Sequence, residues 1–239
     1  VLTDLEVNDI AKQLWPAVQE GLIQTQGNNL FRIKDLTSDA VREILNHSTL
    51  DAKNSFSHER LHLAAYEKNE TSILPAMHWK IAKKLKADTQ EKEIDSFLNE
   101  ILFHLNLGSS LIVTEGERLD LIQLNIRAGI KAKGATAYPL AIQYFAKAIE
   151  SLNKSDWQNN YNICLQLYNE ASVAAFLNHD AEKTDIYTQI VLENAKDLLD
   201  KIATYDLLIV KYIANDQVLS AIKLGLSVLE ELGIYFPLF

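Results

Sequence analysis

The sequence predicts an all-α fold. Only 8 of the 239 residues are glycine and only 4 are proline, too few for the many turns of a β fold. Leucine, isoleucine, alanine, lysine, glutamate, asparagine and glutamine dominate, and most of these residue types favour or tolerate a helix. Apolar residues recur at steps of three and four over most of the chain, which is the spacing of one face of a helix.

The segment Leu121–Leu152 shows this pattern most clearly and predicts two antiparallel helices joined by a break at Lys133–Tyr138. Pro139 opens the second helix, where a missing backbone N–H costs little. The small and aromatic positions have spacings of 12, 4 and 3, as in a tetratricopeptide helix pair: Gly129, Ala141, Phe145 and Ala148. Such a pair cannot bury both faces alone, so further pairs are expected beside it.

Later helices repeat this arrangement. Small residues recur in the second helix of each pair at intervals of 43 and 37 residues: Ala141, Thr184 and Ala221. We therefore expect a tetratricopeptide-like helical-repeat superhelix over residues 71–239. Apart from the pair itself and the helix that leads into it from Glu115, its helical segments are predicted over residues 71–86, 91–107, 157–175, 187–202, 205–212 and 218–232.

Residues 1–70 are predicted to form a small winged-helix-like piece with one β-hairpin. In order, we expect a helix, the two hairpin strands, a short helix, a loop and a longer helix: residues 4–20, 22–26, 30–33, 40–46, 47–55 and 56–68. Pro16 is expected to kink or break the first helix and Gly21 to end it. Gly27–Asn29 is expected to form the hairpin turn, and Ser57 to cap the last helix.

Charge and composition exclude several classes of function. The net charge is −9, and the densest basic stretch, Lys80–Lys86, fits the solvated face of a helix better than a phosphate-binding strip, so no nucleic-acid partner is expected. No apolar run is long enough to span a membrane, so no membrane partner is expected. The single Cys164 precludes an internal disulfide and fits the reducing cytoplasm, where we expect the protein to work.

Several segments are similar to one family. Phe56-Ser-His-Glu-Arg60, followed by Ala64-Ala-Tyr66, resembles the F-x-H-D-R-x-x-x-A-A-Y segment of large bacterial multi-sensor signalling kinases. Five further segments resemble those that follow it there: His104–Gly108, Leu124–Gly129, Ala135–Tyr138, Trp157 with Tyr161, and Tyr212–Ala214. The resemblance covers nearly the whole chain.

The resemblance implies a parent protein with a serine/threonine kinase domain, a P-loop ATPase module, this helical region, and then sensor and histidine-kinase domains. Residues 1–70 would be the end of the ATPase module. The chain itself would be a non-catalytic protein-interaction and signal-coupling module without a cofactor, and its partner would be a protein or another domain of its parent. No G-x-x-x-x-G-K-[ST] motif occurs, so we expect no ATP hydrolysis by the chain alone.

Two groups of side chains are candidate sites. By resemblance, His58 and Arg60 would sense the nucleotide bound to the ATPase module, and the alternative for His58 is a capping or structural role. Asn125, Arg127 and Lys131 flank the apolar face of their helix and are candidates for an interaction surface.

A different class of function is the alternative. His58-Glu-Arg-Leu-His62 matches H-E-x-x-H, which places two imidazoles one helical turn apart with a carboxylate between them, as in zinc-dependent hydrolases. The extended metalloprotease pattern fails because Ala65 and Lys68 stand where glycine and histidine are required. No second motif selects a third ligand among the distant carboxylates: Glu91, Glu93 and Glu100.

Overall fold

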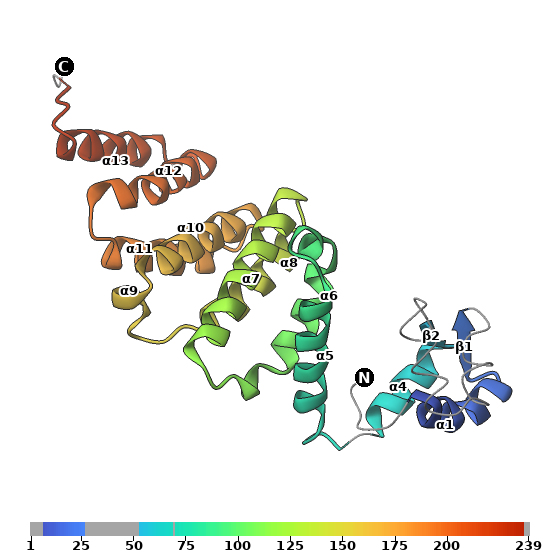
Figure 1. Cartoon of the computed structure of the whole chain (residues 1–239). Coiled ribbons are helices and arrows are strands. Elements are labelled where there is room, and N and C mark those ends of the chain that lie inside the picture. Colours follow the sequence, from blue (N-terminus) through green and yellow to red (C-terminus); the bar gives the residue numbers. More distant parts are fainter. Residues whose placement is uncertain (1–6, 27–52, 69, 237–239) are drawn as a thin grey trace. The chain divides into compact units, whose positions relative to one another are not determined.

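The computed structural model describes residues 7–26, 53–68 and 70–236, and these are mostly helical (Figure 1). The chain divides into two compact units, Val1–Lys84 and Leu85–Phe239. The all-α prediction is therefore confirmed, with one small sheet in the first unit. Among the described helices, none is both long and apolar enough to cross a membrane.

The first unit contains the two strands. Helix α1 (Val7–Gln19) continues through Pro16, so of the predicted kink or break the break does not occur. Gly21, two residues after the last helical residue, has a left-handed conformation, in line with the predicted helix end. Strand β1 (Ile23–Gln26) confirms the first strand of the predicted hairpin. The hairpin turn, the strand over 30–33 and the helix over 40–46 lie outside the described residues.

The partner of β1 in the described part of the chain was not foreseen. Strand β2 (Lys53–Phe56) pairs antiparallel with β1, with Ile23 opposite Phe56. We predicted a loop over 47–55 and a helix from 56, and both predictions are wrong for residues 53–56. The segment Lys-Asn-Ser-Phe has no alternation of apolar and polar residues, so the strand exists only through a pairing distant in sequence.

Helix α4 (Glu59–Glu67) begins after His58, whose Nδ1 accepts a hydrogen bond from the backbone N–H of Arg60 at 3.2 Å. The predicted cap, Ser57, instead donates its hydroxyl and its N–H to the carbonyl of Leu22, 3.1 and 3.0 Å away. Ser57 is therefore used to hold the strand end, which leaves the capping position to His58. Helix α5 (Leu74–Asp88) follows, and the division between the units falls within it.

The second unit is a succession of helices. Helix α6 (Ile94–Leu107) follows the 3₁₀ turn Glu91–Glu93, and a second 3₁₀ turn, Ser109–Leu111, leads to α7. A capping box between Thr114 and Glu117 opens α7. The helices from there to the C-terminal end are α7 (Glu115–Gly134), α8 (Tyr138–Glu150), α9 (Asp156–Asn159), α10 (Tyr161–Leu177), α11 (Ala181–Asn194), α12 (Leu198–Ala214) and α13 (Val218–Glu231).

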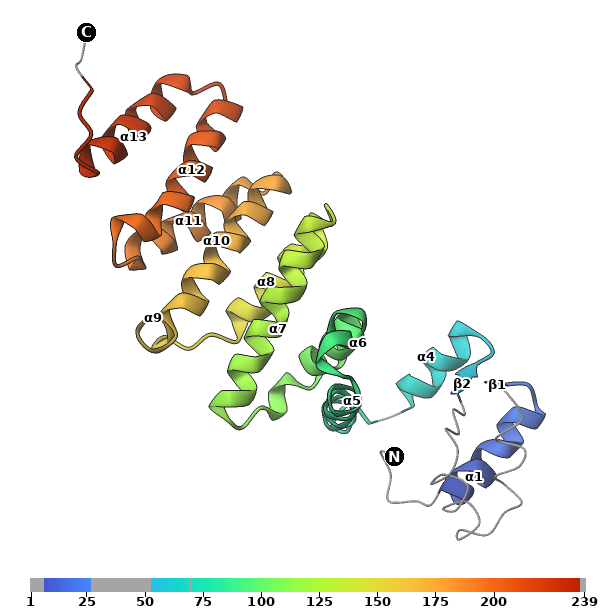
Figure 2. The same cartoon turned by 45° about the horizontal axis from the view of Figure 1, so that its top comes forward.

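Six of these helices form successive hairpins, α7–α8, α10–α11 and α12–α13, and each hairpin packs against the next (Figure 2). Two predicted boundaries are wrong. The face predicted from Tyr187 to Ile202 is split, because α11 ends at Asn194 and α12 begins at Leu198. The short α9 precedes α10, where one helix from 157 was expected. Helical spacing continues through both breaks, so periodicity alone did not show them.

All three hairpins turn in the same way. A residue other than glycine has a positive φ near 60° at each turn: Thr136, His179 and Asp216. In each, the next residue donates its N–H to the carbonyl of the third-last residue of the first helix, at 2.8 to 2.9 Å. This is the bonding of a Schellman motif, and it satisfies carbonyls that a helix end would leave open. The turns lie 43 and 37 residues apart, which matches the intervals predicted from sequence.

The first and third hairpins each pair a glycine on one helix with a large side chain on the other. In α7–α8, Gly129 faces Phe145, and a Cβ on the glycine would lie 2.4 Å from the ring. In α12–α13 the order is reversed, because Gly225 is on the second helix and Ile209 on the first, and a Cβ on Gly225 would lie 3.8 Å from Ile209 Cδ1. Only Gly129 is required for close helix approach, because a Cβ at Gly225 would make an ordinary van der Waals contact. Phe145 is buried in a core cluster that α10 completes with Leu167, Ala171 and Ala174.

Candidate interaction surface

A groove runs between α7 and α10 and has a volume of about 310 Å³. We call it the α7–α10 groove. It is lined by three isoleucines, two glutamine amides and one guanidinium: Ile126, Ile130, Ile163, Gln123, Gln166 and Arg127. Arg127 belongs to the predicted interaction surface, and the other five residues were not predicted. Gln123, Arg127 and Ile130 are spaced by four and three, so they share one helix face, which was the available signal.

Arg127 and Lys131 both reach the beginning of α6. Arg127 Nε lies 2.7 Å from Asp95 Oδ1, and Lys131 Nζ donates to the backbone carbonyl of Asp95 at 2.5 Å. The hydrogen bond from Arg127 is the main cause that lowers the pKa of Asp95. Arg127 is about 43% exposed, so it can still meet a partner. The role of both residues in binding stays a prediction.

Asn125 lies elsewhere, fully buried on α7. Its amide and that of Asn106 on α6 exchange two hydrogen bonds, at 3.0 and 3.1 Å. Asn125 also donates to the carbonyl of Leu121 at 3.0 Å. A buried amide without partners is costly, so this reciprocal pair fixes α6 against α7. Asn125 therefore has no surface to offer to a partner, for the physical reason that its polar atoms are used inside the protein.

A buried ion pair joins the first hairpin to the segment that leads into the second. Arg118 donates two hydrogen bonds to the carboxylate of Asp156, at 2.7 and 2.8 Å, and a third to the carbonyl of Ser151 at 2.9 Å. Asp156 is 1% exposed and also accepts from the N–H of Asn153 and the amide of Asn160. These bonds lower the pKa of Asp156 to about 2, with Arg118 as the largest cause.

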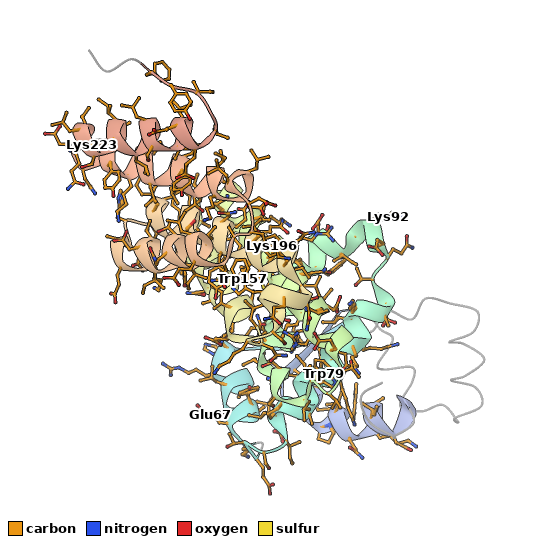
Figure 3. All side chains as sticks on the ribbon, turned by 90° about the vertical axis from the view of Figure 1, so that its left-hand side faces the viewer. Glu67, Trp79, Lys92, Trp157, Lys196 and Lys223 are labelled. Carbon is orange, nitrogen blue, oxygen red and sulfur yellow. The ribbon has the colours of Figure 1, made fainter. Side chains whose placement is uncertain are left out.

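An aromatic cluster continues from this ion pair along α10. Trp157, labelled in Figure 3, stacks on Tyr168 with ring centroids 5.7 Å apart. Tyr161 donates its hydroxyl to Asp200 at 2.5 Å and accepts from the N–H of Lys196, whose Nζ lies 4.2 Å from the same ring. The tyrosine thereby fixes the start of α12 to the start of α10. These contacts explain the aromatic residues through packing and hydrogen bonding.

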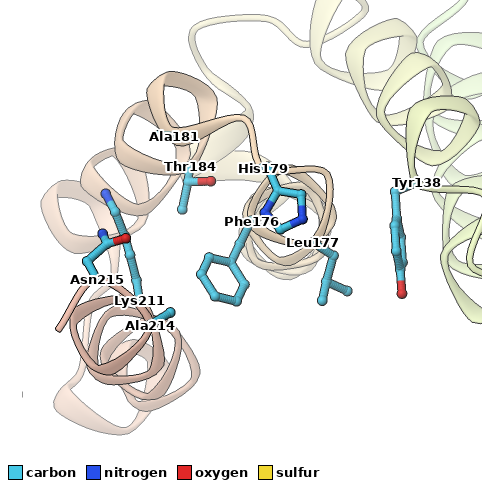
Figure 4. Close-up of a pocket in the computed structure, with 9 residues that line it drawn as sticks. All are labelled: Tyr138, Phe176, Leu177, His179, Ala181, Thr184, Lys211, Ala214 and Asn215. Atoms are coloured by element: carbon cyan, nitrogen blue, oxygen red, sulfur yellow. The ribbon is translucent and has the colours of Figure 1, made fainter.

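A second groove, of about 600 Å³, lies at the turn ends of the hairpins. Figure 4 shows His179 between Tyr138 on one side and Lys211 with Asn215 on the other. Phe176 and Leu177, the last residues of α10, form its apolar floor. Lys211 is paired with Asp185.

The H-E-x-x-H segment begins at the N-cap of α4, where His58 is exposed and Arg60 lies in the first turn. The side chain of His62 lies outside the described residues. Among the side chains that the structure does describe, no group of three or more His, Cys, Asp or Glu residues could hold a metal ion. The observed capping bond supports a structural role for His58, while nucleotide sensing by His58 and Arg60 stays a prediction.

Comparison with known proteins supports a signalling origin. A stretch of 106 residues, 41% of the chain, is 34% identical to hybrid signal transduction histidine kinase G of Dictyostelium discoideum. The stretch covers 3% of that protein, so the chain corresponds to only a small part of this relative. No family model matches the chain. No solved structure matches it.

Proposed function

We propose that this chain is a non-catalytic protein-interaction and signal-coupling module of a large cytoplasmic signalling kinase. In this proposal α7–α13 form a tetratricopeptide-like superhelix, and residues 1–70 are the winged-helix-like end of an ATPase module. The similarity to a histidine kinase supports a signalling role. The parent would combine the ATPase module with serine/threonine and histidine kinase domains, as the family resemblance implies.

The observation that carries the proposal is the threefold repetition of one hairpin with one turn geometry. Stacked hairpins of this kind produce extended surfaces, and in such proteins the surface is the functional part. The α7–α10 groove offers aliphatic side chains with two amides and a guanidinium, a combination suited to the backbone and side chains of a protein segment. We propose that another domain of the parent, or a separate protein, binds there.

Coupling requires that one hairpin move with the next. Arg118 and Asp156 make a bidentate, largely buried ion pair between the first hairpin and the segment that leads into the second. Asn106 and Asn125 exchange two amide hydrogen bonds that join α6 to the first hairpin. Geometry of this kind resists bending, because a small displacement leaves buried polar groups unpaired. A change of state at one end of the stack would therefore reach the other end as a rigid displacement.

Site-specific photo-crosslinking in the full-length protein tests the binding surface. A crosslinking amino acid at Gln166, in the groove, is expected to form adducts with another domain or a bound protein. The matched control is Glu193 on α11, an exposed position that does not line the groove. Gln123→Trp, which fills the groove, should abolish the adducts from position 166. Equal adduct yields from both positions would show that the groove is not the binding surface.

A further inference from the structure

The outward face of the α12–α13 hairpin carries large apolar side chains. On α13, Leu219 and Ile222 are 75% and 51% exposed and lie one helical turn apart. On α12, Leu199 and Val210 are 74% and 50% exposed. The opposite side of α13 is already used, because Ala221 and Val228 are buried. A hairpin with a second apolar face is typical of an internal repeat, since terminal repeats carry a polar outer face.

The residues at the corresponding positions of the first hairpin are covered by the next hairpin. Counted from the turn residues Thr136 and Asp216, three positions correspond: Leu119 with Leu199, Ile130 with Val210, and Ile142 with Ile222. In the first hairpin all three pack into the core cluster that α10 closes, and Ile142 is only 8% exposed. Large aliphatic residues at the same three positions are therefore covered by the next hairpin in α7–α8 and exposed in α12–α13.

The joint between the second and third hairpins indicates which partner chemistry fits. There the position of Ile142 and Ile222 is taken by Asp185, which forms an ion pair with Lys211 of α12. The position of Lys211 is taken in α10 by Ala174, which lies in the same core cluster as Ile142. The residues at these two positions therefore match across each joint: isoleucine on the second helix of a hairpin meets alanine on the next hairpin, and aspartate meets lysine. Since α13 has isoleucine, its partner helix should present a small apolar residue.

We propose that the outward face of α12–α13 docks a further helical hairpin of the same polypeptide, whose first helix presents small apolar residues as α10 does. The interface continues the one that joins the first two hairpins. A second copy of the chain cannot stack head to tail on this face, because the corresponding side of α7 is covered by α6. The inference does not depend on what binds the α7–α10 groove.

Hydrogen exchange of the α13 amides, measured in the full-length protein and in the 239-residue chain, tests the proposal. We expect these amides to exchange at least ~10-fold more slowly in the full-length protein, because docking protects them. Ile222→Lys should remove the added protection in the full-length protein and leave exchange and melting temperature unchanged in the 239-residue chain. The control, Val113→Lys at a site 90% exposed, should change neither protein.

Two results would overturn the proposal. Equal exchange of α13 in the two proteins would show that nothing covers this face. A dimeric 239-residue chain, detected by sedimentation, that becomes monomeric with Ile222→Lys would show that a second copy covers it instead. Failure of the photo-crosslinking experiment at Gln166 would leave this proposal standing, because the two surfaces are separate.

Discussion

Close approach of α7 and α8 at Gly129 gives the sharpest prediction for stability. A Cβ at this position would lie 2.4, 2.7 and 2.8 Å from three carbons of the Phe145 ring, well inside van der Waals contact. The ring is 1% exposed and cannot move into solvent. Overpacking a core costs about 1–3 kcal/mol, and we expect the upper end for Gly129→Leu. Removing a helical glycine returns about 1 kcal/mol, so the net loss should be about 2 kcal/mol.

Urea denaturation of the 239-residue chain measures this loss. Gly116→Ala, in the same helix with no atom within 4 Å of its added Cβ, is the matched control and should not be destabilising. Phe145→Leu should partly rescue Gly129→Leu, because a smaller partner leaves room for the new side chain. Unchanged stability of Gly129→Leu, or additive effects in the double variant, would show that these two residues do not set the distance between the helices.

Three other predictions concern buried polar groups and metal. Because the pKa of Asp156 is about 2 in the folded protein and 3.8 ordinarily, its contribution to stability is complete above pH 4 and should fall by about 2 kcal/mol toward pH 2; Asp156→Asn should flatten this acid limb in pH-dependent denaturation. Asn125→Ala leaves the amide of Asn106 unpaired and should lower the free energy of unfolding, measured by urea titration, by about 1–3 kcal/mol. An unchanged free energy of unfolding would mean that water replaces the lost hydrogen bonds. Metal analysis of the purified protein should find no stoichiometric zinc, and zinc that disappears with His62→Ala would instead support a hydrolase.

Sequence patterns predicted the helical hairpins well where local and tertiary preferences agree. Gly129, Pro139 and the turn before it follow from steric rules that act within a few residues, so spacing was sufficient. The interval of the repeats was also visible in the small residues of the second helices. The breaks at residues 195–197 and before Tyr161 were missed because apolar spacing continues across them by coincidence.

The candidate site was only partly predictable. Arg127 was identified and lines the α7–α10 groove, but Asn125, two residues away on nearly the opposite side of the same helix, is buried against α6. Sequence spacing shows which residues share a helix face. It does not show which faces are buried, because the segment that covers a face is distant in the sequence. For the same reason Ser57 was expected as a cap, although strand pairing brings the carbonyl of Leu22 to its hydroxyl.

By itself the sequence determined the helical class, the position of most helices and the absence of an internal disulfide, since these depend on composition and on neighbours along the chain. Tertiary structure decided which polar side chains are buried in pairs, which strand pairs with β1, and which apolar faces are covered. Those properties depend on contacts between residues distant in sequence. The free energy of a buried hydrogen bond or ion pair exists only once both partners have been brought out of water together.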